Sequence, residues 1–163
     1  MAVSEELKQT VGKALGRIPS GVFILTAGRG ADAAAMMASW VQQASFEPPT
    51  VSIALAKGRP IADLIKSTKT LGLSIVPEND TTLMKRYARG IKPGEDPFHD
   101  VETIATPGGI PVMKNALAWL EGRVISTCDF GGDHELIIAE VTHGLLLHPG
   151  QSFTHQRGSG FHY

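Results

Sequence analysis

The first turns of the chain show hydrophobic positions at helical spacing. Four apolar residues recur at intervals of three or four and so share one helical face: Leu7, Val11, Leu15 and Ile18. Ser4 precedes them in an N-cap position, and the acidic residues Glu5 and Glu6 follow it at the positive end of the helix dipole. We therefore predict a helix that begins at Glu5 and ends before Pro19.

The rest of the chain consists mostly of short apolar runs bounded by Gly, Pro and Ser, a pattern typical of strands. These runs predict strands over residues 22–26, 51–55, 71–76, 116–120, 123–128 and 136–147. The last run is interrupted at Gly144, where we expect a bend or bulge. Two short helices lie between strands, one opened by Pro60 and one capped by Asp80. Residues 91–111 are rich in Pro, Gly and Asp, so we expect a loop there.

Many short strands with few helices favour a mainly β (α+β) fold, built as a small antiparallel barrel. A regular alternation of strands and helices is missing, which argues against a doubly wound parallel sheet. The length of 163 residues fits one domain, and we expect that domain to cover residues 1–163. The 18 glycines and 10 prolines indicate many turns, which argues against a helical bundle.

Charge, apolar run length and cysteine content argue against several classes of protein. Fifteen Lys and Arg residues against 16 Asp and Glu give a net charge of -1, so we expect no nucleic-acid partner. The apolar runs are too short to cross a bilayer, so we expect no membrane association. The acidic start lacks the basic region of a signal peptide, and the single Cys128 excludes an internal disulfide framework; both favour the cytoplasm. Because Cys128 lies in a strand pattern, we expect a buried, inert thiol.

Two segments in the first half of the chain suggest a ligand site. Residues 36–49 combine small and hydroxyl side chains with Trp40 and Phe46, which suits close contact with a flat polar ligand. The same pattern also fits an amphipathic strand followed by a Pro-stiffened turn. Lys57 and Arg59 flank a glycine directly before the helix at Pro60, where cations and free backbone N–H groups favour a phosphate. The alternative is a solvated surface loop.

Two further segments lie in the second half. His134 follows Gly-Gly-Asp at the start of a predicted strand, where it can donate a hydrogen bond or relay a proton; alternatively it belongs to a turn and points to water. The tail over residues 155–163 has the composition of a frayed terminus. The six His residues form no metal-binding motif, although a site of His and carboxylate ligands assembled in space stays open. The sequence contains no Gly-x-Ser-x-Gly motif, which argues against a serine hydrolase.

Taken in order, these segments resemble the flavin reductase family, which has an FMN-binding split-barrel domain. The resemblance rests on residues 21–26, the Met-x-Ala-Ser-Trp stretch that ends at Trp40, residues 45–49, Lys57, and Gly-Asp-His at 132–134. Within the family the chain is most similar to the flavin reductase module attached to cyanobacterial flavodiiron proteins, through residues 14–21, 38–41, 43–49 and 83–85. The resemblance implies an antiparallel Greek-key FMN-binding split β-barrel with a few short helices.

The resemblance also implies positions for the cofactor. The flavin ring and ribityl chain would contact Met37, Ala38, Ser39, Trp40 and Val41, with Ser45 closing the pocket. The FMN phosphate would be held by Lys57 and Arg59. His134 would be the catalytic residue beside the nicotinamide or the flavin ring, and the tail would bring His155, Arg157 and Tyr163 close to the site. Where relatives often have Cys after Leu-Glu, this chain has Gly122, so no thiol acts there.

The activity implied by the resemblance is an NAD(P)H:FMN oxidoreductase. A hydride would pass from the nicotinamide of NADH or NADPH to flavin N5, and the electrons would go on to an acceptor protein. The family also implies a homodimer with the flavin at the subunit interface. Two alternatives stay open: an FMN-binding electron carrier that is reduced by a partner protein, and a split-barrel ligand-binding module without flavin.

Overall fold

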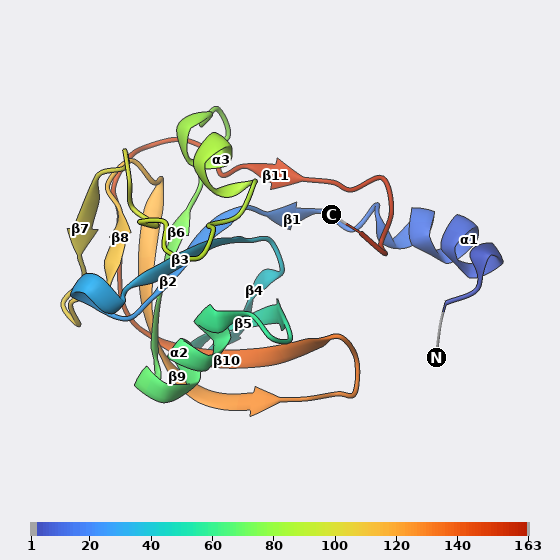
Figure 1. The fold of residues 1–163 in the computed structure, drawn as a ribbon, viewed down its shortest axis with the longest axis horizontal. Coiled ribbons are helices and arrows are strands. Elements are labelled where there is room, and N and C mark those ends of the chain that lie inside the picture. The colour runs from blue at the N-terminus through green and yellow to red at the C-terminus, as the bar shows by residue number, and fades with distance from the viewer. Residues whose placement is uncertain (1–2, 163) are drawn as a thin grey trace.

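A seven-stranded antiparallel sheet forms the body of the molecule, shown in Figure 1 for the computed structural model, which describes residues 3–162. The strand order is β3-β2-β6-β9-β10-β5-β4, and the sheet curls into a split β-barrel. Its members are β2 (Phe23–Ala27), β3 (Ala34–Ala38), β4 (Val41–Phe46), β5 (Pro49–Ala56), β6 (Thr70–Ile75), β9 (Ala118–Cys128) and β10 (His134–Leu146). The expected mainly β, antiparallel split barrel is confirmed.

Two small sheets accompany the barrel. The strand β1 (Ser20–Gly21) pairs antiparallel with β11 (Thr154–His155), which joins the two ends of the chain. The strand β7 (Thr103–Ala105) pairs with β8 (Pro111–Met113). A 3-10 turn, η1 (Gly30–Asp32), connects β2 to β3.

Two helices begin at the predicted residues, and the third begins one residue later. In α1 (Glu5–Leu15), Ser4 Oγ accepts a hydrogen bond of 3.2 Å from the backbone N–H of Leu7. The helix α2 (Pro60–Thr68) has Pro60 in its first turn. Before α3 (Thr82–Tyr87), the Asp80 carboxylate accepts from the backbone N–H of Leu83 at 2.9 and 3.1 Å. The predicted roles of Ser4 as N-cap and of Pro60 at the first helical position are confirmed, whereas Asp80 caps α3 through its side chain from one residue before the N-cap position, which Thr81 occupies. No helix within residues 3–162 is long and apolar enough to span a membrane.

Two hydrophobic clusters lie on opposite faces of β2. The first lies between the sheet and α2 and is built from side chains that include Leu25, Ile53, Ile65, Leu73 and Ile137. The second lies on the side of α3 and β8 and includes Ile24, Val76, Leu83, Tyr87 and Met113. Neighbouring residues on a strand point to opposite faces, so β2 contributes to both clusters.

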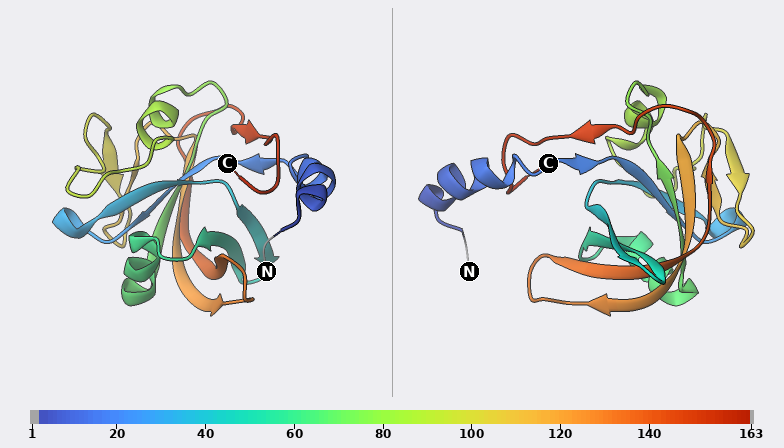
Figure 2. Two further views of the ribbon diagram at one scale, coloured as in Figure 1. Left: turned by 45° about the vertical axis from the view of Figure 1, so that its right-hand side comes forward. Right: turned by 180° about the vertical axis from the view of Figure 1, so that it is seen from behind.

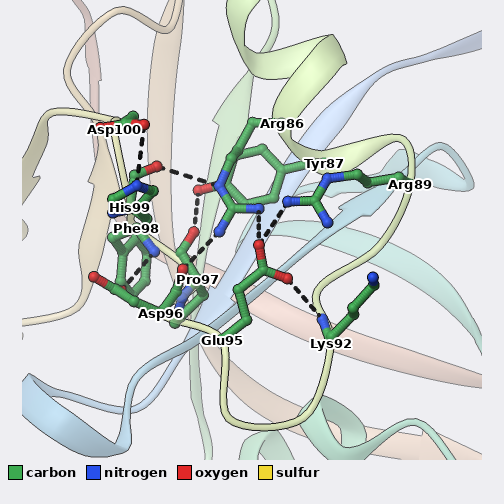
Figure 3. A network of polar contacts seen from close by, with 10 residues as sticks. All are labelled: Arg86, Tyr87, Arg89, Lys92, Glu95, Asp96, Pro97, Phe98, His99 and Asp100. Atoms are coloured by element: carbon green, nitrogen blue, oxygen red, sulfur yellow. Dashed lines mark hydrogen bonds and ion pairs between the residues drawn. The ribbon is translucent and has the colours of Figure 1, made fainter.

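The loop after α3 is held by side chains that converge on Glu95 (Figure 3). Its Oε1 accepts from Arg86 Nη1 at 3.0 Å and from Arg89 Nη2 at 2.6 Å, and its Oε2 accepts from the backbone N–H of Lys92 at 3.0 Å. The hydrogen bond from Lys92, followed by that from Arg89, lowers the pKa of Glu95 to about 2. These bonds fix the loop between α3 and β7 over residues that pair with no strand.

Four expectations about the strands are wrong. Residues 116–120 and 123–128 are not two strands, because Gly122 lies inside the continuous strand β9 and pairs with Leu71. The irregularities of β10 fall between Ile138 and Ala139 and between Val141 and His143, whereas Gly144 stays in register. The expected loop over 91–111 contains β7. Cys128 is exposed.

The exposure of Cys128 follows from where the strands end. The strand β6 pairs with β9 only from Ala118 to Arg123, so the rest of β9 has β10 as its partner on one side. The end of β9 therefore extends beyond β6, and its last four residues are all exposed. An apolar run alone does not reveal that its end lies outside the core.

Candidate functional site

Three side chains from distant parts of the chain meet at one end of the barrel. Trp40 lies in the short link between β3 and β4, His134 is the first residue of β10, and Arg157 follows β11. The ring centroids of Trp40 and His134 are 4.7 Å apart, with the planes tilted by 43°. The guanidinium carbon of Arg157 lies 4.8 Å from the centroid of the Trp40 ring, within range of a cation–π interaction. All three were candidate site residues, and the fold brings them together.

His134 is held by its own strand and by its neighbour. It pairs with Ala56 of β5, and its Nδ1 lies 2.9 Å from Oδ1 of Asp133. The hydrogen bond with His134 lowers the pKa of Asp133. The residue is only 9% exposed, so the alternative in which its side chain points to water is wrong.

A groove of about 410 Å³ opens beside Trp40. Its walls come from the end of α1, from the β3–β4 link, from the facing strands β4, β5 and β10, and from the C-terminal segment. Leu15 and Ile18 line the α1 side, Gln42 and Ser52 supply an amide and a hydroxyl, and Arg157 supplies a cation. Among the lining residues there is no carboxylate, so the groove suits a flat ligand with polar edges and negative charge.

The candidate residues of the segment around Trp40 divide between groove and core. Ser39 and Val41 line the groove together with Trp40. Ala38 is buried in the cluster under α2, and Met37 packs against the other cluster. Ser45 pairs with Thr50 further along β4 and is not part of the groove lining.

Lys57 and Arg59 lie beyond the end of β5, outside the groove lining. Lys57 Nζ forms an ion pair of 2.7 Å with Oδ1 of Asp129, and the hydrogen bond from Lys57 lowers the pKa of that carboxyl group. The backbone N–H of Lys57 donates to the carbonyl of Asp133 at 2.9 Å, which ties this cationic turn to the residue before His134. Arg59 is the exposed N-cap residue of α2.

The C-terminal segment is attached to the body of the molecule. His155 pairs with Ser20, and the backbone N–H of Arg157 donates to the carbonyl of Gly16 at 3.2 Å. The expectation of a frayed terminus is wrong for this stretch. Figure 2 shows the segment running beside β1 toward α1, which stands away from the sheet. Tyr163 lies outside the described residues.

Three features were missed at the sequence level. Ser52, Ala54 and Leu136 line the groove, yet each sits in an ordinary strand pattern without a motif. Ser52 and Ala54 are two apart on β5 and face the same side, so a run of small residues at alternate positions was the available signal.

Two other possible sites carry less chemistry. Within residues 3–162 no group of three or more His, Cys, Asp or Glu side chains is arranged to hold a metal ion. A groove of about 530 Å³ near the end of α2 is lined by Gly28, Arg29, Asp32, Leu64, Thr68 and Thr70. It contains none of the candidate residues and no aromatic side chain.

Comparison with known sequences finds one matching family profile and relatives among flavoproteins. The profile of the flavin reductase like domain matches residues 15–159. A putative diflavin flavoprotein A 3 from Synechocystis sp. is 38% identical over 163 residues, which cover 99% of this chain and 27% of that protein. The chain thus spans about a quarter of the length of this relative.

Solved structures share the fold. An NADH:FAD oxidoreductase from Streptomyces globisporus matches with a TM-score of 0.83 at 23% identity, covering 97% of this chain and 93% of that chain. The same protein in complex with NAD and FAD fragments matches with a TM-score of 0.82 at 22% identity, covering 98% and 93%. The styrene monooxygenase flavin reductase from Pseudomonas putida matches with a TM-score of 0.75 at 24% identity, covering 90% and 91%. With its fold and its profile in agreement, the chain belongs to the flavin reductase like domain family.

Proposed function

We propose that this protein is an NAD(P)H-dependent FMN reductase whose site is the groove beside Trp40. The observation that carries the proposal is that Trp40 and Arg157 meet in the lining of a groove of about 410 Å³, while the His134 ring packs beside Trp40 outside that lining. An aromatic face, hydroxyl and amide groups and a cation are what a flavin or a nicotinamide nucleotide needs from a protein.

The residues present fit a flavin. Trp40 and Val41 offer flat apolar contact, and Ser39, Ser52 and Gln42 offer hydrogen-bonding groups for the polar edge of a ring system. Lys57 and Arg59 lie just beyond the C-terminal end of β5, beside the N-terminus of α2, and would hold a phosphate there. This terminal phosphate position is why we propose FMN as the flavin.

When bound, a flavin supplies a hydride acceptor at N5, so the protein needs no pair of catalytic carboxylates. The part played by this chain is orientation. His134 would donate a hydrogen bond to the nicotinamide amide, with Asp133 bonded to its Nδ1 and so fixing the ring. Trp40 would limit the tilt of the stacked rings, and holding two reactants face to face lowers the barrier by reducing the entropy lost on reaction.

We also propose a homodimer whose second copy borders the groove. The apolar stripe on α1 is 44% exposed at Leu7, 39% at Val11 and 38% at Leu15, and Ile18 is 60% exposed. A continuous apolar helix face in contact with water marks a docking surface. Because Leu15 and Ile18 also line the groove, a second copy bound to this stripe would lie next to the flavin. Reduced flavin would then pass its electrons to a separate acceptor protein.

A spectroscopic assay tests the activity. The purified protein is mixed with FMN, and oxidation of NADH and of NADPH is followed at 340 nm against FMN alone. We expect oxidation well above the free-flavin rate with at least one donor. Oxidation no faster than free flavin sinks the proposal, and a protein-bound flavin that is bleached by dithionite but not by either donor indicates an electron carrier instead.

A further inference from the structure

The C-terminal segment is bound along the molecule by a series of backbone contacts. The N–H of Phe153 donates to the carbonyl of Val76 at 2.8 Å, and β11 then pairs with β1. Further on, the N–H of Arg157 donates to Gly16, and the N–H of Gly160 donates to the carbonyl of Gly12 at 2.7 Å. The backbone of Arg157 is therefore fixed on both sides.

Two glycines allow the segment to lie this close to α1. A Cβ atom at Gly16 would lie 2.6 Å from the carbonyl oxygen of Arg157, and one at Gly160 would lie 2.3 Å from Cβ of Leu15. Neither neighbour is the end of a flexible side chain, so a larger residue would push the segment away. Arg17 strengthens the contact, because its Nη2 donates to the carbonyl oxygen of Arg157 at 3.2 Å.

Fixing the backbone also fixes where the Arg157 side chain can reach. Its guanidinium lies 4.8 Å from the centre of the Trp40 ring, and the His134 ring is 4.7 Å from the same centre. The backbone of Trp40 is anchored, since its carbonyl accepts from the N–H of Ala54 at 2.9 Å. The orientation of the indole therefore depends on the groups that pack against it, which include Arg157 and His134.

We propose that Arg157 is a positioning residue, which holds the indole of Trp40 against His134 and thereby shapes the wall of the groove. The expected effect on FMN rests on the proposed function, but the contact between Arg157 and Trp40 can be tested without FMN. A cation over an aromatic face contributes enough to select one side-chain orientation. Lysine would keep the charge and lose the planar stacking, so it replaces arginine only in part.

Tryptophan fluorescence tests the contact directly. The chain has two tryptophans, and Trp119 is replaced by Phe so that the emission reports on Trp40 alone. Arg157→Gln removes the charge, Arg157→Lys is the conservative variant, and Gly16→Val displaces the segment while keeping Arg157. Lys13→Gln, on exposed α1, is the matched control for loss of one positive charge.

We expect Arg157→Gln and Gly16→Val to change the Trp40 emission and to raise the Kd for FMN about three- to tenfold. Arg157→Lys should lie between Arg157→Gln and the unaltered protein, and Lys13→Gln should match the unaltered protein. If Arg157 had only a structural role, its variants would lower the melting temperature, but the Trp40 emission and the Kd for FMN would not follow the order Arg, Lys, Gln at position 157.

Unchanged Trp40 emission in Arg157→Gln overturns the inference, and so does an unchanged Kd for FMN when the unaltered protein binds FMN. If the unaltered protein binds no FMN, the proposed function fails instead. The response of the Trp40 emission then still decides whether Arg157 positions the indole.

Discussion

The ammonium group of Lys57 is paired with a carboxylate, its Nζ lying 2.7 Å from Oδ1 of Asp129. A phosphate that binds at Lys57 must therefore share this cation with Asp129 or displace it. Asp129 is itself held by the backbone N–H of Gly131 at 2.8 Å, so the carboxylate stays in place when Lys57 turns away. Removing the Lys57 cation should therefore lower the affinity for a phosphate at this position, and removing the Asp129 charge should raise it.

The double variant Lys57→Ala, Arg59→Ala should weaken FMN binding by about tenfold or more, because it removes two charge-assisted contacts from partly exposed cations. Asp129→Asn should have the opposite effect and tighten FMN by about two- to fivefold, since it frees Lys57. Both are measured by titrating FMN fluorescence, with Lys13→Gln as the charge control. Equal FMN affinity in all of these proteins would place the phosphate elsewhere.

His134→Ala should lower kcat by about tenfold and change the Kd for FMN less than about twofold, because His134 is proposed to orient the donor rather than the flavin. Asp133→Asn should give a smaller decrease, since it weakens the hydrogen bond that fixes the imidazole. Steady-state kinetics and FMN titration on the same preparations separate the two quantities. Equal losses of kcat and FMN affinity would show that His134 mainly supports the groove.

Glu95 should make stability depend on acid. Its pKa is lowered to about 2 from an ordinary value of 4.5, so its contribution to folding is complete above pH 4.5 and is lost as the pH falls toward 2. Glu95→Gln should lower the melting temperature at pH 7, and the difference from the unaltered protein should shrink over that window. The exposed pair of Glu102 and Lys114 provides the control Glu102→Gln, with a smaller effect. A difference that is the same at pH 7 and pH 2.5 would contradict this.

Val11→Glu should dissociate the proposed dimer, because a charge in the middle of the α1 stripe cannot be buried without a partner. Light scattering after size-exclusion chromatography gives the mass at micromolar concentration. Lys13→Gln changes a charge on the same helix outside the stripe and should leave the mass unchanged. A monomeric unaltered protein would refute the dimer at once.

Local features of the fold were predictable from sequence, because their causes are local. Ser4, Pro60 and Asp80 mark helix starts through their own chemistry, and the apolar runs mark strands. The continuity of β9 through Gly122 was not predictable in this way. A Cβ atom at Gly122 would lie 3.1 Å from Cβ of Ala139, a tight contact set by a strand later in the chain.

The candidate site shows the same division. The order of motifs pointed to Trp40, His134 and Arg157, but their stacking depends on where three separate segments end in space. Ser52 was missed because a polar residue at alternate positions of a strand has the same pattern whether it faces solvent or a groove. The order of the strands decides which polar face is concave. That order depends on contacts between residues that are far apart in the sequence.

The pairing of β1 with β11 sets the order in which this protein can become functional during synthesis. Ser20 meets His155, so the wall that carries Arg157 forms only after almost all of the strands have left the ribosome. The barrel strands can associate earlier, because their contacts need no residue from the last segment. A nascent chain would therefore reach a folded barrel before it completes the groove, and the proposed ligand binding would begin only after Arg157 has been translated.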